Sequence, residues 1–370
     1  MMKFSCEKAL LQSAIAITSR AVAQKSSIPA LEGLLLHADH YLTISGYNMQ
    51  TGIRTRVSAD VTDGGDIVLN ARLFGDIIRR MPDDVVTFTA DDKQMVHLSC
   101  GDADFDILGL SAADYPDLPE VEDEFSVSIQ QKRLRAMIEE TAFAVSTNES
   151  RPVHTGSLFE ISAEGLTVVS VDGFRLALRR EPLERIDGGA FRFVAPGSAL
   201  NEVEKICEDS DSLISIIQGK RHLLFETGST QLICRRLEGE FLDYRNAIPR
   251  SNPICVQVET KAMMNSLDRV SVVISEKLKS PLRCVIGEGE IDMTTKTALG
   301  NAHDCCPVEG NGNGLEIGFN NRYLMDALRY APADTVKMQL NTGISPCIIT
   351  PVDDSDNFLY MVLPVRLKAQ

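Results

Sequence analysis

Apolar and polar residues alternate along this chain in a fixed order of patterns, and that order occurs three times. Each copy begins with apolar residues at helical spacing, continues through a polar loop, and then alternates apolar and polar residues over three short runs separated by glycine turns. The copies span residues 7–57, 130–180 and 260–308. Repeats of roughly 125 residues are too long for solenoid units, so each copy predicts a small domain.

A second amphipathic helix follows in each copy. Its residues in the first and third copies recur at one fixed offset: Asn70, Arg72, Asp76, Arg79 and Pro82 match Asn320, Arg322, Asp326, Arg329 and Pro332. The asparagine is expected to cap this helix and the proline to end it. We therefore expect an α+β fold of three repeated domains, residues 1–122, 126–250 and 254–370, each with two helices backed by antiparallel sheets.

Several local expectations can be tested against a structure. The first helix should bury Leu10, Ala14, Ile17 and Ala21, and the second helix should bury Phe74, Ile77, Ile78 and Met81. Thr260 should cap the helix that follows it. Residues 310–314, which read GNGNG, predict a turn or flexible hairpin, and residues 358–367 predict a terminal strand.

The composition is that of a globular protein from a reducing compartment. The chain has 370 residues, and no apolar run in it approaches the length of a membrane span. Nine scattered cysteines, an odd number without a CxxC pair, favour free thiols and a cytoplasmic location. The net charge of −15 argues against nucleic-acid binding on average, although partners respond to the local field.

The sequence offers no catalytic constellation. The six histidines are spread over all three copies without metal-ligand spacing, and no HExxH, GxSxG, GxGxxG or phosphate-loop pattern occurs. The nearest ligand pair, His303 and Asp304, is more typical of a solvated turn. We expect no enzyme activity, no metal and no cofactor, and we keep an unrecognised hydrolase only as a minor hypothesis.

Basic residues recur on the outer faces of the predicted helices. Helices pack about 8–10 Å apart, so six of them close a circle too narrow for a DNA duplex, whereas twelve leave roughly 25 Å of clearance. Two chains could therefore encircle DNA and contact phosphates without reading sequence. Any one of these cations alone is more typical of a solvated face, and repetition favours the DNA-facing role of the set Lys8, Arg20, Lys25, Arg72, Arg79, Lys132, Arg133, Arg135, Lys205, Lys261, Arg269, Arg322 and Arg329.

Five segments together identify a family. They are LGLSAADYPDLP (108–119), VSVDGFRLALRR (169–180), EGEFLDYRNAIPR (238–250), IGFNNRYLMDAL (317–328) and YMVLPVRL (360–367). Over essentially its full length the chain resembles the bacterial sliding clamp family, the beta subunit of DNA polymerase III. The alternative from the residues alone is a monomeric, repeat-built peptide-binding scaffold without a role on DNA.

The resemblance implies a clamp fold that dimerises head to tail into a closed ring around double-stranded DNA. It pairs Phe105, Ile107 and Leu108 of one chain with Val272 and Val273 of the other. It also implies a groove for short peptides from the DNA polymerase III alpha subunit, the clamp loader, other polymerases and repair proteins. The matching groove positions are Arg151, His154, Val171, Gly173, Phe174, Arg175, Leu176, Leu242, Asn246, Ala247, Asn320, Tyr323, Ser345, Pro346, Met361, Val362, Leu363, Pro364, Val365, Arg366 and Leu367.

Three of these positions depart from the family pattern. His154 stands where an aliphatic residue is usual, Leu242 where proline is common, and Asn246 where arginine is frequent. Arg175 and Arg366 are expected at the rim of the groove as polar anchors. Residues 368–370 extend past the usual end of the family and could reach the site.

Overall fold

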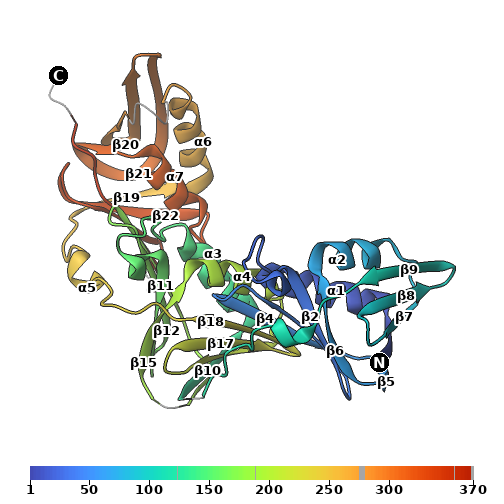
Figure 1. The fold of residues 1–370 in the computed structure, drawn as a ribbon. Helices are drawn as coiled ribbons and strands as arrows, with labels where there is room; N and C mark the ends of the chain where they lie inside the picture. Colours follow the sequence, from blue (N-terminus) through green and yellow to red (C-terminus); the bar gives the residue numbers. More distant parts are fainter. Residues whose placement is uncertain (123, 188, 275–279, 354, 368–370) are drawn as a thin grey trace. The chain divides into compact units, whose positions relative to one another are not determined.

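The chain folds into two compact units in a computed structural model that describes residues 1–122, 124–187, 189–274, 280–353 and 355–367 (Figure 1). The first unit comprises residues 1–132, 184–189 and 202–236, and the second comprises residues 133–183, 190–201 and 237–370. The middle sequence repeat therefore contributes strands to both units. The residue ranges of the units also divide α3 (Gln131–Ala142) and α4 (Gly197–Ile206).

The first unit holds two antiparallel sheets, with strand orders β5-β1-β7-β8-β9 and β14-β10-β16-β17-β18-β4-β3-β2-β6. Among the described residues, its complete α-helices are α1 (Lys8–Thr18) and α2 (Ala71–Arg80). Its strands are β1 (Met2–Glu7), β2 (Gly33–Ala38), β3 (Leu42–Tyr47), β4 (Thr51–Val57), β5 (Asp60–Asp63), β6 (Gly65–Asn70), β7 (Val85–Ala90), β8 (Met95–Cys100), β9 (Ala103–Leu108), β10 (Phe125–Gln130), β14 (Arg185–Asp187), β16 (Leu213–Gln218), β17 (His222–Thr227) and β18 (Thr230–Arg235).

The second unit is built on one antiparallel sheet of strand order β15-β11-β12-β13-β24-β23-β22-β19-β21-β20. Its complete helices are α5 (Tyr244–Ala247), α6 (Thr260–Ser271) and α7 (Asn321–Arg329). Its strands are β11 (Gly156–Ser162), β12 (Gly165–Val171), β13 (Arg175–Glu181), β15 (Phe191–Pro196), β19 (Ile254–Glu259), β20 (Leu282–Thr297), β21 (Gly300–Phe319), β22 (Thr335–Leu340), β23 (Cys347–Pro351) and β24 (Phe358–Val362).

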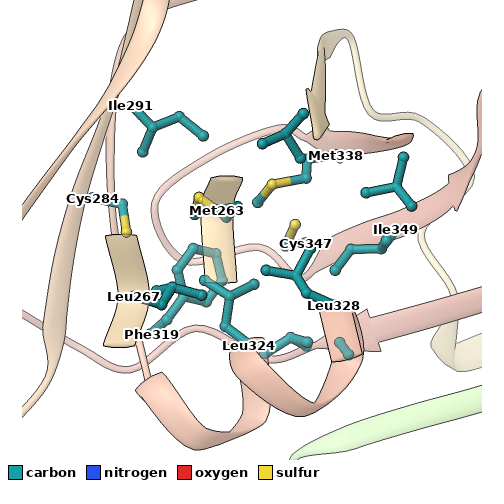
Figure 2. Close-up of a cluster of buried hydrophobic side chains, with 14 of the residues drawn as sticks. Met263, Leu267, Cys284, Ile291, Phe319, Leu324, Leu328, Met338, Cys347 and Ile349 are labelled. Carbon is teal, nitrogen blue, oxygen red and sulfur yellow. The ribbon is translucent and has the colours of Figure 1, made fainter. Parts of the chain in front are cut away.

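A continuous apolar core lies between the helices and the sheet of the second unit (Figure 2). Met263 and Leu267 project from α6, Leu324 and Leu328 project from α7, and Phe319 at the end of β21 lies among them. Each of these side chains is at most 1% exposed. Full burial of such a side chain contributes roughly 1.5–3 kcal/mol, so this core fixes both helices against the sheet.

The second helix of the first repeat matches its prediction. The Asn70 side chain accepts a hydrogen bond from the Leu73 backbone N–H, which is the expected cap. The buried face consists of Ala71, Phe74, Ile77 and Ile78, and Met81 is buried directly after the helix. The Asn320 side chain caps α7 by accepting a hydrogen bond from the Arg322 backbone N–H, so the repeated helix pattern is confirmed in both copies.

The predicted buried face of the first helix is only partly right: Ala14 and Ala21 are buried as expected, but Ile17 is half-buried. Leu10 is 44% exposed, and the side chains that α1 buries are Leu11, Ala14, Ile15 and Thr18. The polar character of Thr18 concealed this face in the sequence. Its hydroxyl donates to the Ala14 carbonyl oxygen at 2.7 Å, so burial leaves no donor unpaired.

Two predictions in the third repeat are also wrong. The N-cap of α6 is Glu259, and Thr260 is the first helical residue, with its hydroxyl directed at the carbonyls of Ala333 and Asp334. The glycine-rich run 310–314 lies inside β21. A Cβ on Gly312 would overlap the Ile286 side chain, so glycine is needed there for close strand packing and not for a free turn.

The terminal strand is shorter than predicted. β24 ends at Val362, and residues 363–367 continue without strand pairing. Their backbone is held by alternate hydrogen bonds, from Leu363 N to Phe174 O at 2.9 Å and from Val365 N to Gly318 O at 2.8 Å. Pro364 between them has no N–H to donate, which is consistent with the loss of the ladder. Among the described residues, no helix has the length and apolar character needed to cross a membrane.

Candidate functional site

Several predicted groove residues belong to one apolar cluster of the second unit. Val171, Leu176 and Met361 are buried together, and Ala247 and Leu363 pack against them half-buried. They come from β12, β13, α5 and the end of β24, segments far apart in sequence. The strand pairing of Leu176 with Met361 explains how β13 and β24 bring them together. Leu176 and Val362 are at most 1% exposed, so they belong to the core under the predicted groove and do not contact solvent.

The C-terminal tail, residues 363–367, lies over β21. A Cβ on Gly318 would overlap the Val365 carbonyl oxygen and would lie 2.8 Å from the Leu367 side chain, so only glycine permits this contact. Val365 is 36% exposed and Arg366 is exposed. The tail therefore presents Val365 and Arg366 to solvent, while Leu363, Pro364 and Leu367 are half-buried and the backbone is fixed. Residues 368–370, which were expected to reach the site, lie outside the described residues.

Arg175 is held by carboxylates on two elements. Its Nε donates to Asp172 Oδ2 at 2.9 Å, and its Nη1 donates to Asp326 Oδ2 at 2.6 Å. The guanidinium also lies over the Tyr323 ring, 4.6 Å from the centroid, and over the Phe143 ring at 5.3 Å. The side chain is 12% exposed. Arg175 therefore braces β13 against α7 and has little freedom to act as a rim anchor.

A hollow of about 450 Å³ lies beside the apolar cluster that contains Val171, Leu176 and Met361, and His154 and Leu242 are among its lining residues. The His154 ring meets the Phe241 ring edge to face, with centroids 5.5 Å apart. Partial burial, with help from the nearby Arg151 charge, lowers the pKa of His154 below its usual value. A neutral imidazole at physiological pH adds no charge of its own to this hollow, which Arg151, Glu238, Glu240 and Asp243 also line.

Exposed apolar side chains gather on the segments that carry the predicted groove. Phe174 is 58% exposed and stacks on Tyr323 at 6.0 Å, while Leu242 is 43% exposed. Ile344, which the sequence reasoning missed, is 80% exposed next to Ser345 and Pro346. Its position before the predicted Ser–Pro pair was the available signal. Contiguous patches of exposed apolar side chains are typical of docking surfaces, and these three residues are candidate parts of one.

The remaining groove predictions have structural explanations of their own. The turn between β12 and β13 places Gly173 at φ +90°, and the Asp172 carboxylate accepts from the backbone N–H groups of Phe174 and Arg175. The Asn246 side chain donates to Asp243 Oδ2 at 2.7 Å. Ser345 and Pro346 lie in the turn that precedes β23. Within the described ranges, no hydrogen bond or ion pair fixes the side chains of Arg151 and Arg366, so both can reorient toward a ligand.

The predicted DNA-facing cations are exposed apart from Arg133, which is half-buried, and Lys8, whose side chain is 13% exposed and pairs with Asp83. Acidic neighbours that the sequence reasoning did not consider offset several of them. The ion pairs are Arg20–Glu202, Arg79–Asp76, Lys132–Asp211, Lys205–Glu202, Lys261–Asp334 and Arg269–Asp304. In the part of the chain that the structure describes, no ion pair involves Lys25, Arg72, Arg135 or Arg329.

The predicted dimer residues lie at sheet edges and helix ends. Strand β9 is the last strand of its sheet, and Phe105 and Leu108 on it are 36% and 68% exposed. Val272, at the end of α6, is 80% exposed. The Val273 carbonyl oxygen accepts from Thr297 Oγ1 at 3.0 Å, which ties this helix end to the hairpin between β20 and β21.

Family models match the chain in three consecutive segments. The N-terminal, central and C-terminal domains of the DNA polymerase III beta subunit match residues 2–119, 128–243 and 245–366. The chain belongs to the DNA polymerase III beta subunit family. The family supplies the three-domain clamp fold and makes the chain a sliding clamp, and the monomeric scaffold without a role on DNA is not favoured.

Relatives agree over the whole length. The beta sliding clamp of Synechocystis sp. is 32% identical and covers 99% of this chain and 100% of that protein. The beta sliding clamp of Halalkalibacterium halodurans is 31% identical, with 94% and 95% covered. A solved structure from Eubacterium rectale, described as a putative DNA polymerase III beta subunit, is 30% identical, covers 99% of both chains and superposes with a TM-score of 0.93.

Proposed function

We propose that two copies of this chain close into a ring around double-stranded DNA and hold a DNA polymerase on its template. The role is that of a processivity factor, and it needs no catalytic step from the chain. The observation that carries the proposal is that two strand edges, on β9 and on residues 300–307 of β21, have no partner strand among the described residues. The equivalent edges of the other repeats pair with each other inside the chain.

The internal equivalents show what such edges do. In the first unit, β18 of the second repeat pairs antiparallel with β4 of the first repeat. In the second unit, β24 of the third repeat pairs antiparallel with β13 of the second repeat. The strands left over by this pattern are β9 and the start of β21. Within the described residues, β9 pairs only with β8, and residues 300–307 pair only with β20.

Exposed apolar side chains flank both free edges, which supports a seam between two copies. Phe105 and Leu108 lie on β9, and Leu299 (71% exposed) and Val272 lie at the β20–β21 hairpin and the adjoining helix end. An exposed, apolar strand edge is a template for pairing with another chain. The contact is head to tail, and a two-fold arrangement of two copies repeats it twice and leaves neither edge free.

Ring formation can be tested by topology on DNA. Sedimentation should give a species of twice the 40.6 kDa chain mass, and Leu108→Asp should reduce it to the monomer by placing a charge in the seam. Loaded onto nicked circular DNA, the dimer should be retained and should be lost when the circle is linearised. Equal retention on both forms, or a monomeric wild type, would overturn the proposal.

We further propose that the groove binds short peptides of the DNA polymerase III alpha subunit, the clamp loader, other polymerases and repair proteins. The exposed apolar side chains around the hollow and the fixed tail support this reading. Replacing Leu363, Pro364 and Arg366 together by alanine should weaken binding of a Leu- and Phe-containing pentapeptide at least tenfold. Arg192→Ala, an exposed arginine away from the tail, is the control. Unchanged affinity in the triple variant would exclude this surface.

A further inference from the structure

Three potential metal ligands meet on the outward face of the β20–β21 ribbon. Asp292 on β20 is paired with Cys305 on β21, and His303 lies two residues before Cys305 on the same face. The sequence predicted a solvated turn at His303 and Asp304, and this is wrong, because both lie within β21. Asp304 faces the opposite side of the ribbon, where it pairs with Arg269.

The distances within this cluster (Asp292, His303 and Cys305) fit a tetrahedral metal. Cys305 Sγ lies 3.9 Å from Asp292 Oδ2 and 3.7 Å from His303 Nε2, and His303 Nε2 lies 2.7 Å from Asp292 Oδ2. Zinc bonds of about 2.0–2.3 Å place tetrahedral ligands roughly 3.3–3.7 Å apart. The Asp292–His303 pair, now hydrogen-bonded, must open by about 0.6 Å or more, and Cys305 Sγ must approach Asp292 Oδ2 by about 0.2 Å, which side-chain rotations provide.

The surroundings favour a cation. The carboxylates of Glu290, Asp292 and Asp304 place Cys305 in a negative electrostatic field. A thiol in this field is a weak nucleophile in the absence of metal, but the same field attracts a divalent ion. All three cluster side chains are half-buried or exposed, so an ion can enter from solvent.

The internal seams specify what a second copy would place opposite the cluster. Leu232 pairs with Ile53 in the first internal seam, and Tyr360 pairs with Ala177 in the second. Leu232 is paired with Phe225, Tyr360 with Ile349, and Phe105 with Leu98. Each pair has the same place in its hairpin, so Leu232 and Tyr360 are equivalent to Phe105.

The other side of each seam is equivalent as well. One strand pair in each copy fixes this equivalence: Leu42↔Val57, Leu166↔Glu181 and Ile291↔Cys306. The first member of each pair is the first apolar residue of its strand segment. Ile53, Ala177 and Ala302 each lie four residues before the second member, so they occupy equivalent positions. Both internal seams therefore share one register. Applied to two copies, that register sets Phe105 opposite Ala302 and Asp104 opposite His303.

Side chains at this position do meet across a seam. The pair equivalent to Asp104 and His303 in the first internal seam is Gln231 and Arg54, and Arg54 Nε donates to Gln231 Oε1 at 2.5 Å. The Asp104 side chain is 65% exposed, and its carboxylate lies 3.6 Å from His97 Nε2. A carboxylate is thus available at the position that faces the cluster.

We propose that the cluster binds a divalent transition metal of the zinc class, and that Asp104 of a second copy supplies the fourth ligand. The three-residue part stands on the geometry of one chain, and the fourth ligand rests on the proposed homodimer. Binding releases the Cys305 thiol proton to solvent, and the proton on His303 Nε2 moves through solvent to Nδ1, so that Nε2 and the thiolate coordinate the metal. Two such sites per ring would then couple metal binding to ring closure.

The site can be tested in the full chain with cobalt as a spectroscopic probe. Co²⁺ should bind in one equivalent per chain and give thiolate-to-cobalt charge-transfer absorption in the near ultraviolet. Cys305→Ser should abolish the band and His303→Gln should weaken binding at least tenfold. Cys255→Ser removes the other cysteine that reaches the surface and should leave the band intact. Absence of the band, or its survival in Cys305→Ser, would overturn the site.

The fourth ligand is tested separately. Zinc affinity, measured by competition with a chromophoric chelator, should fall about tenfold in Asp104→Asn, and zinc should lower the dimer dissociation constant relative to protein in EDTA by up to about a hundredfold for two sites. Wild-type zinc affinity in Asp104→Asn would overturn the intersubunit ligand. A monomeric protein that still shows the cobalt band would overturn the ring and the fourth ligand, while supporting the three-residue site.

Discussion

Arg175 Nη1 lies 2.6 Å from Asp326 Oδ2, and this ion pair joins β13 to α7 beside Tyr323, one of the predicted groove residues. Asp172 holds the opposite side of the same guanidinium. Because Arg175 is 12% exposed and Asp326 is 27% exposed, water competes weakly for either group. The pair therefore fixes the position of the β12–β13 turn, whose exposed Phe174 forms part of the groove surface.

Breaking this pair should loosen the groove as well as the fold. Asp326→Asn should lower the free energy of unfolding by about 1–3 kcal/mol, as expected for a charge-assisted hydrogen bond away from water. Pentapeptide affinity should fall with it, because Phe174 loses its fixed position. Urea denaturation and peptide titration measure the two effects. Arg185→Ala breaks an exposed pair with Asp187 and should cost less than about 1 kcal/mol. Equal losses in both variants would contradict the bracing role.

The tail should be displaced by a single methyl group. In Gly318→Ala the new Cβ would overlap the Val365 carbonyl oxygen and the Leu367 side chain, so residues 365–367 must leave β21. Peptide affinity should drop at least tenfold. Gly287→Ala, where the nearest atom would be the Glu290 carbonyl oxygen at an ordinary 3.5 Å, is the matched control. Tail displacement is measured by limited proteolysis near Leu367, and an undisturbed tail in Gly318→Ala would refute the contact.

The sequence predicts local features that recur in more than one repeat. It does not predict features that depend on strand register or on a hydrogen-bonding partner. The second helices were predicted correctly, because their caps and apolar spacing are local features that recur in two copies. The buried face of α1 was not, since the hydrogen bond of Thr18 to Ala14 makes a polar residue buriable. Likewise, Asp292 and Cys305 become neighbours only through the strand register of the β20–β21 ribbon.

The groove and the basic helices show the same division. Resemblance to the family supplied the groove positions, but not the engagement of Arg175 by two carboxylates, because neither Asp172 nor Asp326 was part of the matched set. Counting cations on helix faces also overlooked acids such as Glu202 on α4, which pairs with both Arg20 and Lys205. Charge compensation across elements requires the three-dimensional contacts.

Stability should fall as the pH rises toward neutrality because of one carboxyl. Burial raises the pKa of Glu140 from 4.5 to about 7, although Arg179 lies 2.5 Å away, and Glu181 shares that arginine. The folded state therefore binds a proton more tightly than the unfolded state between these values, so the free energy of unfolding decreases across that window, by about 1–3 kcal/mol.

Urea denaturation at pH 5 and pH 7.5 tests this sign. The loss of stability between the two should be smaller in Glu140→Gln than in the wild type, because glutamine does not titrate. Glu139→Gln changes the exposed neighbouring carboxyl and should retain the wild-type difference. If the free energy of unfolding changed between the two pH values by the same amount in the wild type and in Glu140→Gln, the pKa of Glu140 would not be raised.

DNA binding should depend on the cations that no acid already engages. Removing one cation that neutralises a phosphate should reduce the slope of log affinity against log salt by about 0.9. Replacing Arg72, Arg135 and Arg329 by alanine should therefore lower the slope by about 2–3 on a linear duplex that the ring can thread. The matched control set is Arg79, Lys205 and Arg269, which carries the same total charge. Each of these residues is paired with a carboxylate and must leave that carboxylate before it can bind a phosphate. A larger slope change in the paired set would show that those ion pairs open on DNA and that the unpaired cations do not face the duplex.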